Sequence, residues 1–205
     1  MQRIVCTQWG PPEDLVLVEE PDPVAGEGQV VVEVAAAGVN FVDALFVAGT
    51  YQIKVPPPFT PGSELAGTIT SVGPGVELLQ VGDRVLSSLG LGAFATHAVL
   101  PALGVTRIPD ELDLATAAAL VQSYCTAWFA LKRRTTVRPG ETVLVLGAGG
   151  GVGLAAIDVA RSMGARVIAA ASSDEKLAAA RAMGAADTIA YETEDLKVRA
   201  RELSD

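Results

Sequence analysis

The stretch VLVLGAGGGVG, Val143 to Gly153, reads as a buried strand that runs into a glycine-rich turn. A helical pattern follows the turn and ends at Gly164. A second strand (166–171), a second helix (173–183, ended by Gly184) and a third strand (187–191) come next. Short apolar strands that alternate with helices are typical of a parallel sheet covered on both faces. The sequence therefore predicts an α/β fold with a parallel βαβαβ unit.

The glycine-rich turn follows a strand and opens a helix, which is the context that a dinucleotide-binding fingerprint requires. The match is not literal, because Ala148 stands where the first glycine of G-x-G-x-x-G belongs. The alternative is a turn whose glycines serve only close packing of helix on strand. The complete βαβ unit favours nucleotide binding, with the pyrophosphate at the helix N-terminus. The predicted contacts are Gly147, Ala148, Gly150, Gly151, Val152 and Gly153.

The end of the second strand indicates which nucleotide is bound. An NAD site of this type places a carboxylate there, to bind the ribose hydroxyls. Here Ser172 and Ser173 follow the strand, and Lys176 lies one turn into the next helix. Hydroxyls and a cation suit a 2′-phosphate, so we predict NADPH as the cofactor. The alternatives are helix capping for the serines and a solvated lysine, and nearby Asp174 and Glu175 weaken the argument.

The first half of the chain has a different composition. It is rich in Val, Gly and Pro, and it predicts strands at 29–39, 64–73, 83–89 and 93–100, separated by turn sequences. This pattern indicates a β-rich domain built as a partly closed barrel. From Asp113, a predicted N-cap, residues 113–133 read as a helix without Gly or Pro. We therefore predict two domains, 1–112 and 113–205.

Composition excludes several classes of protein. Half of the 205 residues are apolar and the formal net charge is −9, so a packed core is expected and nucleic acid is not an expected partner. No apolar run approaches the roughly 20 residues of a membrane span, and no signal peptide is evident. Cys6 and Cys125 lie far apart in apolar settings, which favours buried thiols in a reducing cytoplasm over a disulfide.

Longer stretches carry a resemblance to a known family. The chain resembles the zinc-independent quinone oxidoreductase branch of the medium-chain dehydrogenase/reductase superfamily, over the N-terminal two-thirds of that family's length. The resemblance rests on AAAGVNFVDALFVAGTY (35–51), PGSELAGTITSVGPGV (61–76), VGDRV (81–85), RPGETVLVLGAGGGVG (138–153) and residues 160–191. It implies a GroES-like catalytic domain followed by a Rossmann domain.

The zinc sites of related enzymes can be compared residue by residue. Zinc-dependent relatives carry a histidine at the position of Ser63 and a cysteine within Val39 to Phe41, and both ligands are missing here. Two cysteines are too few for a structural zinc lobe, and His97, the single histidine, falls in a predicted strand. We therefore expect no metal, and alcohol oxidation loses its Lewis acid.

The resemblance also implies site residues. Asn40 matches a residue of the active-site cleft that can donate to the acceptor oxygen, Tyr51 lines the cleft, and Thr126 packs near the nicotinamide. Tyr191 matches a residue that joins Lys176 at the 2′-phosphate. The alternative for each residue is a purely structural role. Asn40 would satisfy only backbone groups of its loop, and Tyr51 would pack in the core. Thr126 would be an ordinary helix residue, and Tyr191 would mark the end of a strand. Leu45 stands where some relatives place a polar group, which leaves the choice of quinone open.

These implications predict hydride transfer from NADPH to a small-molecule quinone without zinc. Two alternatives stay open: reduction of an activated C=C bond in an enone or enoyl substrate, and a non-enzymatic protein that binds the cofactor. The sequence supplies one half of a doubly wound domain, so the chain is expected either to be a fragment or to pair with something that completes its sheet, and activity is not expected of it alone. A form of complete family length is expected to be a cytoplasmic homodimer.

Overall fold

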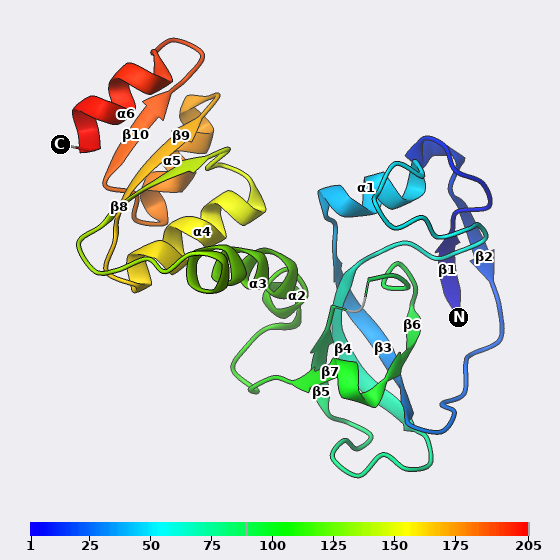
Figure 1. Ribbon diagram of the computed structural model, residues 1–205. Coiled ribbons are helices and arrows are strands. Elements are labelled where there is room, and N and C mark those ends of the chain that lie inside the picture. Colours follow the sequence, from blue (N-terminus) through cyan, green and yellow to red (C-terminus); the bar gives the residue numbers. More distant parts are fainter. Residues whose placement is uncertain (89, 205) are drawn as a thin grey trace. The chain divides into compact units, whose positions relative to one another are not determined.

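The computed structural model describes residues 1–88 and 90–204 of the chain (Figure 1). The chain divides into two compact units, Met1–Gln122 and Ser123–Asp205. Helix α2 (Leu114–Ala118) packs against the strands of the first unit.

The first unit is built on a curled five-stranded antiparallel sheet (Figure 1). Its strands run in the order β6 (His97–Pro101), β3 (Gln29–Gly38), β4 (Glu64–Val72), β5 (Arg84–Ser87) and β7 (Val105–Arg107). Register shifts interrupt the pairing of β3 with β4, and such bulges increase the twist of a sheet. Val30 and Val32 of β3 belong to its core, together with Leu65 and Ile69 of β4 and residues of β5 and β6. Leu89, the end of the predicted strand 83–89, lies outside the described residues.

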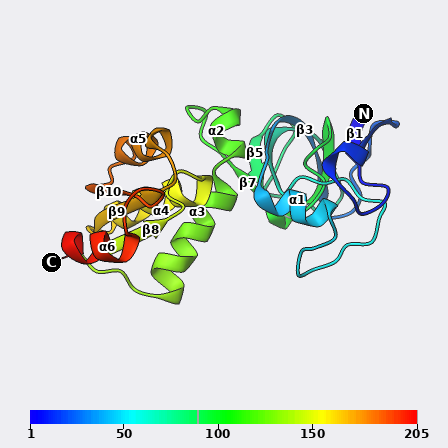
Figure 2. The ribbon, with the colours of Figure 1, turned by 90° about the horizontal axis from the view of Figure 1, so that it is seen from above.

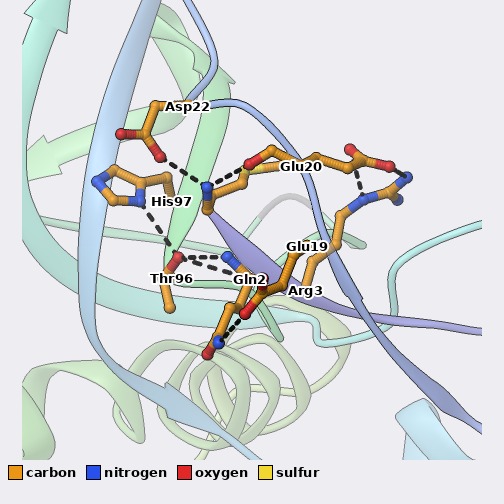
Figure 3. A network of polar contacts seen from close by, with 8 residues as sticks. Gln2, Arg3, Glu19, Glu20, Asp22, Thr96 and His97 are labelled. Atoms are coloured by element: carbon orange, nitrogen blue, oxygen red, sulfur yellow. Dashed lines mark hydrogen bonds and ion pairs between the residues drawn. The ribbon is translucent and has the colours of Figure 1, made fainter.

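An N-terminal hairpin of β1 (Gln2–Val5) and β2 (Val16–Glu19) is tied to this sheet by polar contacts (Figure 3). Arg3 pairs with Glu20 at 2.6 Å across the hairpin itself, and the Gln2 backbone N–H donates to the hydroxyl of Thr96, the residue before β6, at 3.0 Å. His97 begins β6, as its predicted strand position implied, and its Nδ1 lies 3.2 Å from the Thr96 hydroxyl. The histidine is thus part of a polar network at the edge of the sheet.

The second unit holds a parallel sheet with the order β10–β9–β8. Strand β8 (Thr142–Leu146) is central to the predicted fold, yet among the described strands only β9 (Arg166–Ala171) pairs with it. Strand β10 (Asp187–Ala190) lies on the other side of β9. Strand β8 therefore forms one edge of this sheet among the described strands, and Leu144 and Leu146, which share one of its faces, are exposed.

Helices cover both faces of this sheet, as Figure 2 shows for β9 between α5 and α6. Successive strand residues point to opposite faces, so Val167 and Ala169 pack with α4 (Gly151–Ser162) and α5 (Asp174–Ala182). Ile168 and Ala170 pack with α6 (Leu196–Ser204). The predicted parallel βαβαβ unit is confirmed, and α6 is an addition to it.

The helix predicted over 113–133 is interrupted. Asp113 caps α2 by accepting from the backbone N–H of Thr116 at 2.9 Å. Helix α2 ends at Ala118, and α3 (Val121–Trp128) then runs into a π-helical segment, η3 (Phe129–Arg134). The break gives the Gln122 N–H an acceptor, the Glu64 carboxylate at 2.8 Å, in place of a carbonyl of the same helix.

The two cysteines differ in environment. Cys6 is buried as predicted, and its burial raises the pKa of its thiol. Cys125 is exposed, so the prediction of two buried thiols is wrong for this residue. Tyr124 and Ala127 of α3 and Leu131 of η3 pack on α4, and Cys125 lies off that stripe. Among the described residues, no helix is long and apolar enough to cross a membrane.

Candidate functional site

The glycine-rich turn joins β8 to α4 at the carboxyl edge of the parallel sheet. Gly147 has a φ of +61°, a conformation that favours glycine, and Ala148 behind it is fully buried. A Cβ on Gly153 would lie 2.5 Å from the Gly147 carbonyl oxygen, so this glycine is required for close packing of helix on strand. Backbone conformation thus accounts for Gly147, and packing accounts for Ala148 and Gly153.

The packing of helix on strand, which requires glycine at Gly153, gives no comparably strong reason for glycine at Gly150 and Gly151. Gly150 is the N-cap of α4 with an ordinary φ of −88°, and a Cβ there would meet only the Gly147 oxygen, at 3.6 Å. A Cβ on Gly151 would lie 3.0 Å from the Ser123 hydroxyl. No side chain caps the helix, so the N–H groups of its first turn, including that of Val152, are not bonded by a cap. The turn offers an anion the positive end of a helix.

The predicted 2′-phosphate residues lie next to this turn. Lys176 Nζ donates to the Ser172 hydroxyl at 3.1 Å, and Ser173 caps α5 by accepting from the Lys176 backbone N–H at 3.4 Å. The Lys176 side chain passes the turn so closely that a Cβ on Gly149 would lie 2.4 Å from its Cβ. Tyr191 follows β10, and its N–H donates to the carbonyl of Ala171 at the end of β9. The second unit therefore gathers these groups at one sheet edge.

Helix α3 contributes further groups to the second unit. Ser123 lies against Gly151, as the contact above shows, and Thr126 follows one turn later on the same face of the helix. The Tyr124 hydroxyl donates to Asp158 at 3.1 Å, and burial together with this carboxylate raises the pKa of the tyrosine. The Tyr124–Asp158 bond fixes α3 against α4, and with it the position of Thr126.

In the first unit, Asn40 is the N-cap of α1 (Phe41–Val47) and forms a capping box with Asp43. Asp43 Oδ2 accepts from the Asn40 backbone N–H at 2.7 Å. Asp43 is buried, and burial raises the pKa of its carboxyl against the opposing effects of the Asn40 and Ser63 hydrogen-bonding groups. No described group makes a well-formed hydrogen bond to its Oδ1. The helix start is thus held by an acidic group with little access to water.

The side-chain amide of Asn40 is held by the start of β4. Asn40 Nδ2 donates to Glu64 Oε1 at 2.9 Å and lies 3.4 Å from Ser63 Oγ. Both partners are buried, with exposed fractions of 2% for Glu64 and 4% for Ser63. One amide N–H therefore makes a strong, charge-assisted bond, and the other makes a long one.

Tyr51 follows α1 and packs on it. Its ring lies 4.6 Å from the ring of Phe46, between centroids, and its backbone N–H donates to the Leu45 carbonyl at 3.2 Å. Tyr51 and Leu45 are both half-buried. The structure thus places Asn40, Leu45 and Tyr51 on one helix and the loop that follows it.

The sequence-predicted residues fall into two sets, one in each unit. Asn40 and Tyr51 belong to the first, and the glycine turn, Thr126, the serines, Lys176 and Tyr191 belong to the second. Three residues beside these sets were missed: Asp43, Glu64 and Ser123. Over residues 1–88 and 90–204, no group of three or more His, Cys, Asp or Glu side chains could hold a metal ion.

In the comparison with known proteins, the two units match two different family models. A family described as "Alcohol dehydrogenase GroES-like domain" matches residues 26–110, and one described as "Zinc-binding dehydrogenase" matches residues 151–205. A quinone oxidoreductase from Escherichia coli, solved as a complex with NADPH, superposes with a TM-score of 0.91 at 32% identity, over 99% of this chain and 62% of that one. A solved NAD-dependent alcohol dehydrogenase superposes with a TM-score of 0.94 at 34% identity, over 100% of this chain and 67% of that one.

The chain belongs to the quinone oxidoreductase branch of the medium-chain dehydrogenase/reductase superfamily. A curated relative of this branch, the quinone oxidoreductase-like protein 2 homolog of Nematostella vectensis, is 42% identical over 209 aligned residues. The alignment covers 100% of this chain and 56% of the relative, so the chain spans a little over half of that protein's length. The GroES-like and Rossmann-type parts expected from the sequence are both confirmed.

Proposed function

We propose that this protein of the quinone oxidoreductase branch binds NADPH and reduces a small-molecule quinone without zinc. The observation that carries the proposal is the uncapped, glycine-lined N-terminus of α4 with Lys176 and Ser172 beside it. The NADPH complex of the E. coli relative supports it. We further propose that residues 1–112 form the catalytic part and residues 113–205 the cofactor-binding part.

The residues of the second unit fit a phosphorylated dinucleotide. The first-turn N–H groups at Gly151, Val152 and Gly153 would bind the pyrophosphate, because Gly150 leaves room for it to approach the backbone. Lys176 and Ser172 would hold the 2′-phosphate, to which an ammonium and a hydroxyl both donate. Ser173 and Tyr191, placed around the end of β9, would complete this part of the site.

The preference for NADPH over NADH follows from the charges at the end of β9. Its last residues are alanines, and no carboxylate stands at the tip, where an NAD site would bind ribose hydroxyls. Asp174 and Glu175 lie in the first turn of α5 and are exposed, so water screens their repulsion of a phosphate. The Lys176 side chain passes the glycine turn with its Cβ and Cγ, and its ammonium donates to Ser172 at 3.1 Å.

The bound cofactor supplies a hydride, and the protein's own residues prepare the acceptor. Asn40 would donate its second amide N–H to a quinone oxygen, exchanging the long contact to Ser63 for a shorter bond to substrate. That bond stabilises the negative charge that develops on the oxygen. Thr126 would pack near the nicotinamide and Tyr51 would line the acceptor side. Ser63 stands at the position of a zinc ligand in zinc-dependent relatives, and a serine hydroxyl is not among the usual zinc ligands.

The test measures binding and turnover separately. NADPH and NADH affinities are measured by calorimetry on the 205-residue chain and on a form of complete family length, and oxidation of NADPH by the complete form is then followed with 1,4-benzoquinone or 2-cyclohexenone as acceptor. Formation of hydroquinone supports the proposal, whereas formation of the saturated ketone alone identifies the C=C reductase. Tight NADPH binding without turnover of either acceptor identifies a binding protein, and absence of NADPH binding refutes the proposed site.

A further inference from the structure

Glu64 has a buried carboxylate whose two oxygens bond to two different parts of the first unit. Oε1 accepts from the Asn40 side chain at 2.9 Å, and Oε2 accepts from the backbone N–H of Gln122 at 2.8 Å. Only 2% of the residue is exposed, and over the described residues no Lys or Arg forms an ion pair with it. A buried charge held by hydrogen bonds alone is costly, which calls for a reason why a carboxylate stands here.

We propose that Glu64 is a positioning residue that determines which way the amide of Asn40 faces. The inference rests on the proposed function, in which Asn40 donates to the acceptor. A carboxylate can only accept hydrogen bonds, whereas the two ends of an asparagine amide differ in nothing but donor and acceptor character. Glu64 therefore selects the orientation that points Nδ2 inward and leaves a second N–H on that nitrogen for the acceptor.

Close packing holds the Glu64 carboxylate beside the Asn40 amide. A Cβ on Gly38 would lie 2.4 Å from Glu64 Oε1 and 2.9 Å from the carbonyl oxygen of Ala118. Glycine at the end of β3 thus makes room for the carboxylate between the strand and α2. The carboxylate fits against backbone on that side, so it cannot swing away from Asn40 there without a clash.

Asp43 holds Asn40 from the other side. Its Oδ2 bonds to the Asn40 backbone N–H, and the Asn40 side-chain oxygen completes the capping box with the Asp43 N–H. The oxygen of the Asn40 side-chain amide is therefore bonded to Asp43, and one of its N–H groups is bonded to Glu64. The second N–H, near Ser63 Oγ, is the one group of this amide that is weakly bonded. The two carboxylates together leave a single donor for exchange with substrate.

Exchange of Glu64 for glutamine tests the selection directly. Glutamine has one acceptor and one donor, and the Gln122 N–H requires the acceptor. The new amide nitrogen would then face Asn40, which must turn its own oxygen inward and give up its half of the capping box. Asn40→Asp supplies an acceptor for that amide N–H, so the donor and acceptor of the contact are exchanged, and the double variant keeps the total charge of the pair.

The first measurement is a double-mutant cycle in melting temperature on the 205-residue chain. We expect Glu64→Gln to lower the melting temperature by about 2–6 °C, the effect of one mismatched buried hydrogen bond in a chain of this size. Asn40→Asp, which sets two carboxylates against each other, should lower it as well. The double variant should melt above both single variants, and additive losses would overturn the proposal.

The second measurement reports on orientation, which a purely structural role would not change. In the wild type, one Asn40 side-chain amide proton should exchange slowly in nitrogen-15 NMR spectra, and Glu64→Gln should remove that protection. An unchanged Asn40 amide signal in Glu64→Gln contradicts the inference. The NADPH affinity should stay the same in both proteins, because Glu64 lies in the other unit.

Turnover separates this inference from the proposed function. Glu64→Gln should lower kcat for 1,4-benzoquinone about a hundredfold with an unchanged KM for NADPH, and the double variant should regain stability without regaining kcat. If Asn40→Ala retains wild-type kcat, Asn40 is not the donor and the proposed mechanism fails, while coupling in the melting temperatures still supports the Glu64–Asn40 pair. If the coupling is absent, the positioning role fails whatever the turnover.

Discussion

Replacement of Lys176 by alanine should separate the two nicotinamide dinucleotides. The side chain is exposed, and its single described side-chain hydrogen bond runs from Nζ to Ser172 at 3.1 Å. Its removal therefore takes little from the core of the second unit, and Ser173 retains its cap because that bond uses the backbone N–H of residue 176. A large loss of cofactor affinity in the variant would therefore reflect a lost contact between Lys176 and the cofactor.

A charge-assisted hydrogen bond to a phosphate contributes about 1.5–3 kcal/mol, which corresponds to a loss of roughly ten- to a hundredfold in affinity. We expect that loss for NADPH and almost none for NADH, which lacks the 2′-phosphate. Calorimetric titration of the folded variant with both cofactors measures the difference. Lys197→Ala is the matched control, because Lys197 is an exposed lysine of the same unit that begins α6, away from the glycine turn. Equal losses for the two cofactors would refute the assignment of Lys176 to the 2′-phosphate.

Three further results are expected. Gly150→Val should keep the fold, since a Cβ there meets only one oxygen at 3.6 Å, yet lose NADPH binding; a variant with native circular dichroism and wild-type affinity would make the turn a packing feature alone. Asp43→Asn should remove a pH dependence of stability: burial raises the pKa of Asp43, so the folded wild type holds its proton to higher pH and loses stability relative to the variant as pH rises above the ordinary carboxyl range, a trend that parallel melting curves would test. Elemental analysis should find no near-stoichiometric zinc, because Ser63 replaces a histidine ligand and two cysteines cannot build a structural site; zinc that survives chelation would contradict this.

The parallel unit could be predicted from the sequence almost to the residue, because its signals are local. The strand expected up to Gly147 is β8 (Thr142–Leu146), and both predicted helix stops, Gly164 and Gly184, have positive φ. Helix α1 was missed because FVDALFV has apolar residues on several faces, with Phe41 exposed. The break in the helix predicted from Asp113 depends on Glu64, which lies 58 residues before its partner Gln122. A pattern read along the chain does not contain such a contact.

In the candidate site, too, the residues within short segments could be predicted from the sequence, and the residues placed by tertiary packing could not. The glycine turn and the Ser172–Lys176 pair lie within short segments, and the structure brings those segments together at one sheet edge. The contact of Ser123 with Gly151 requires α3 to pack on α4, which no local pattern specifies. Asp43 and Glu64 are of residue types that are seldom buried, yet both are buried in the fold. Tertiary packing alone gives them their partners.

The open edge of β8 has a consequence for how the chain behaves in solution. Backbone N–H and C=O groups along this edge, which pair with no described strand, form a template on which another strand can pair. Repulsion between copies that each carry a formal charge of −9 opposes such pairing. Salt shortens the range of that repulsion, to about 10 Å at 0.1 M. Light scattering should therefore show self-association that grows with both protein concentration and ionic strength.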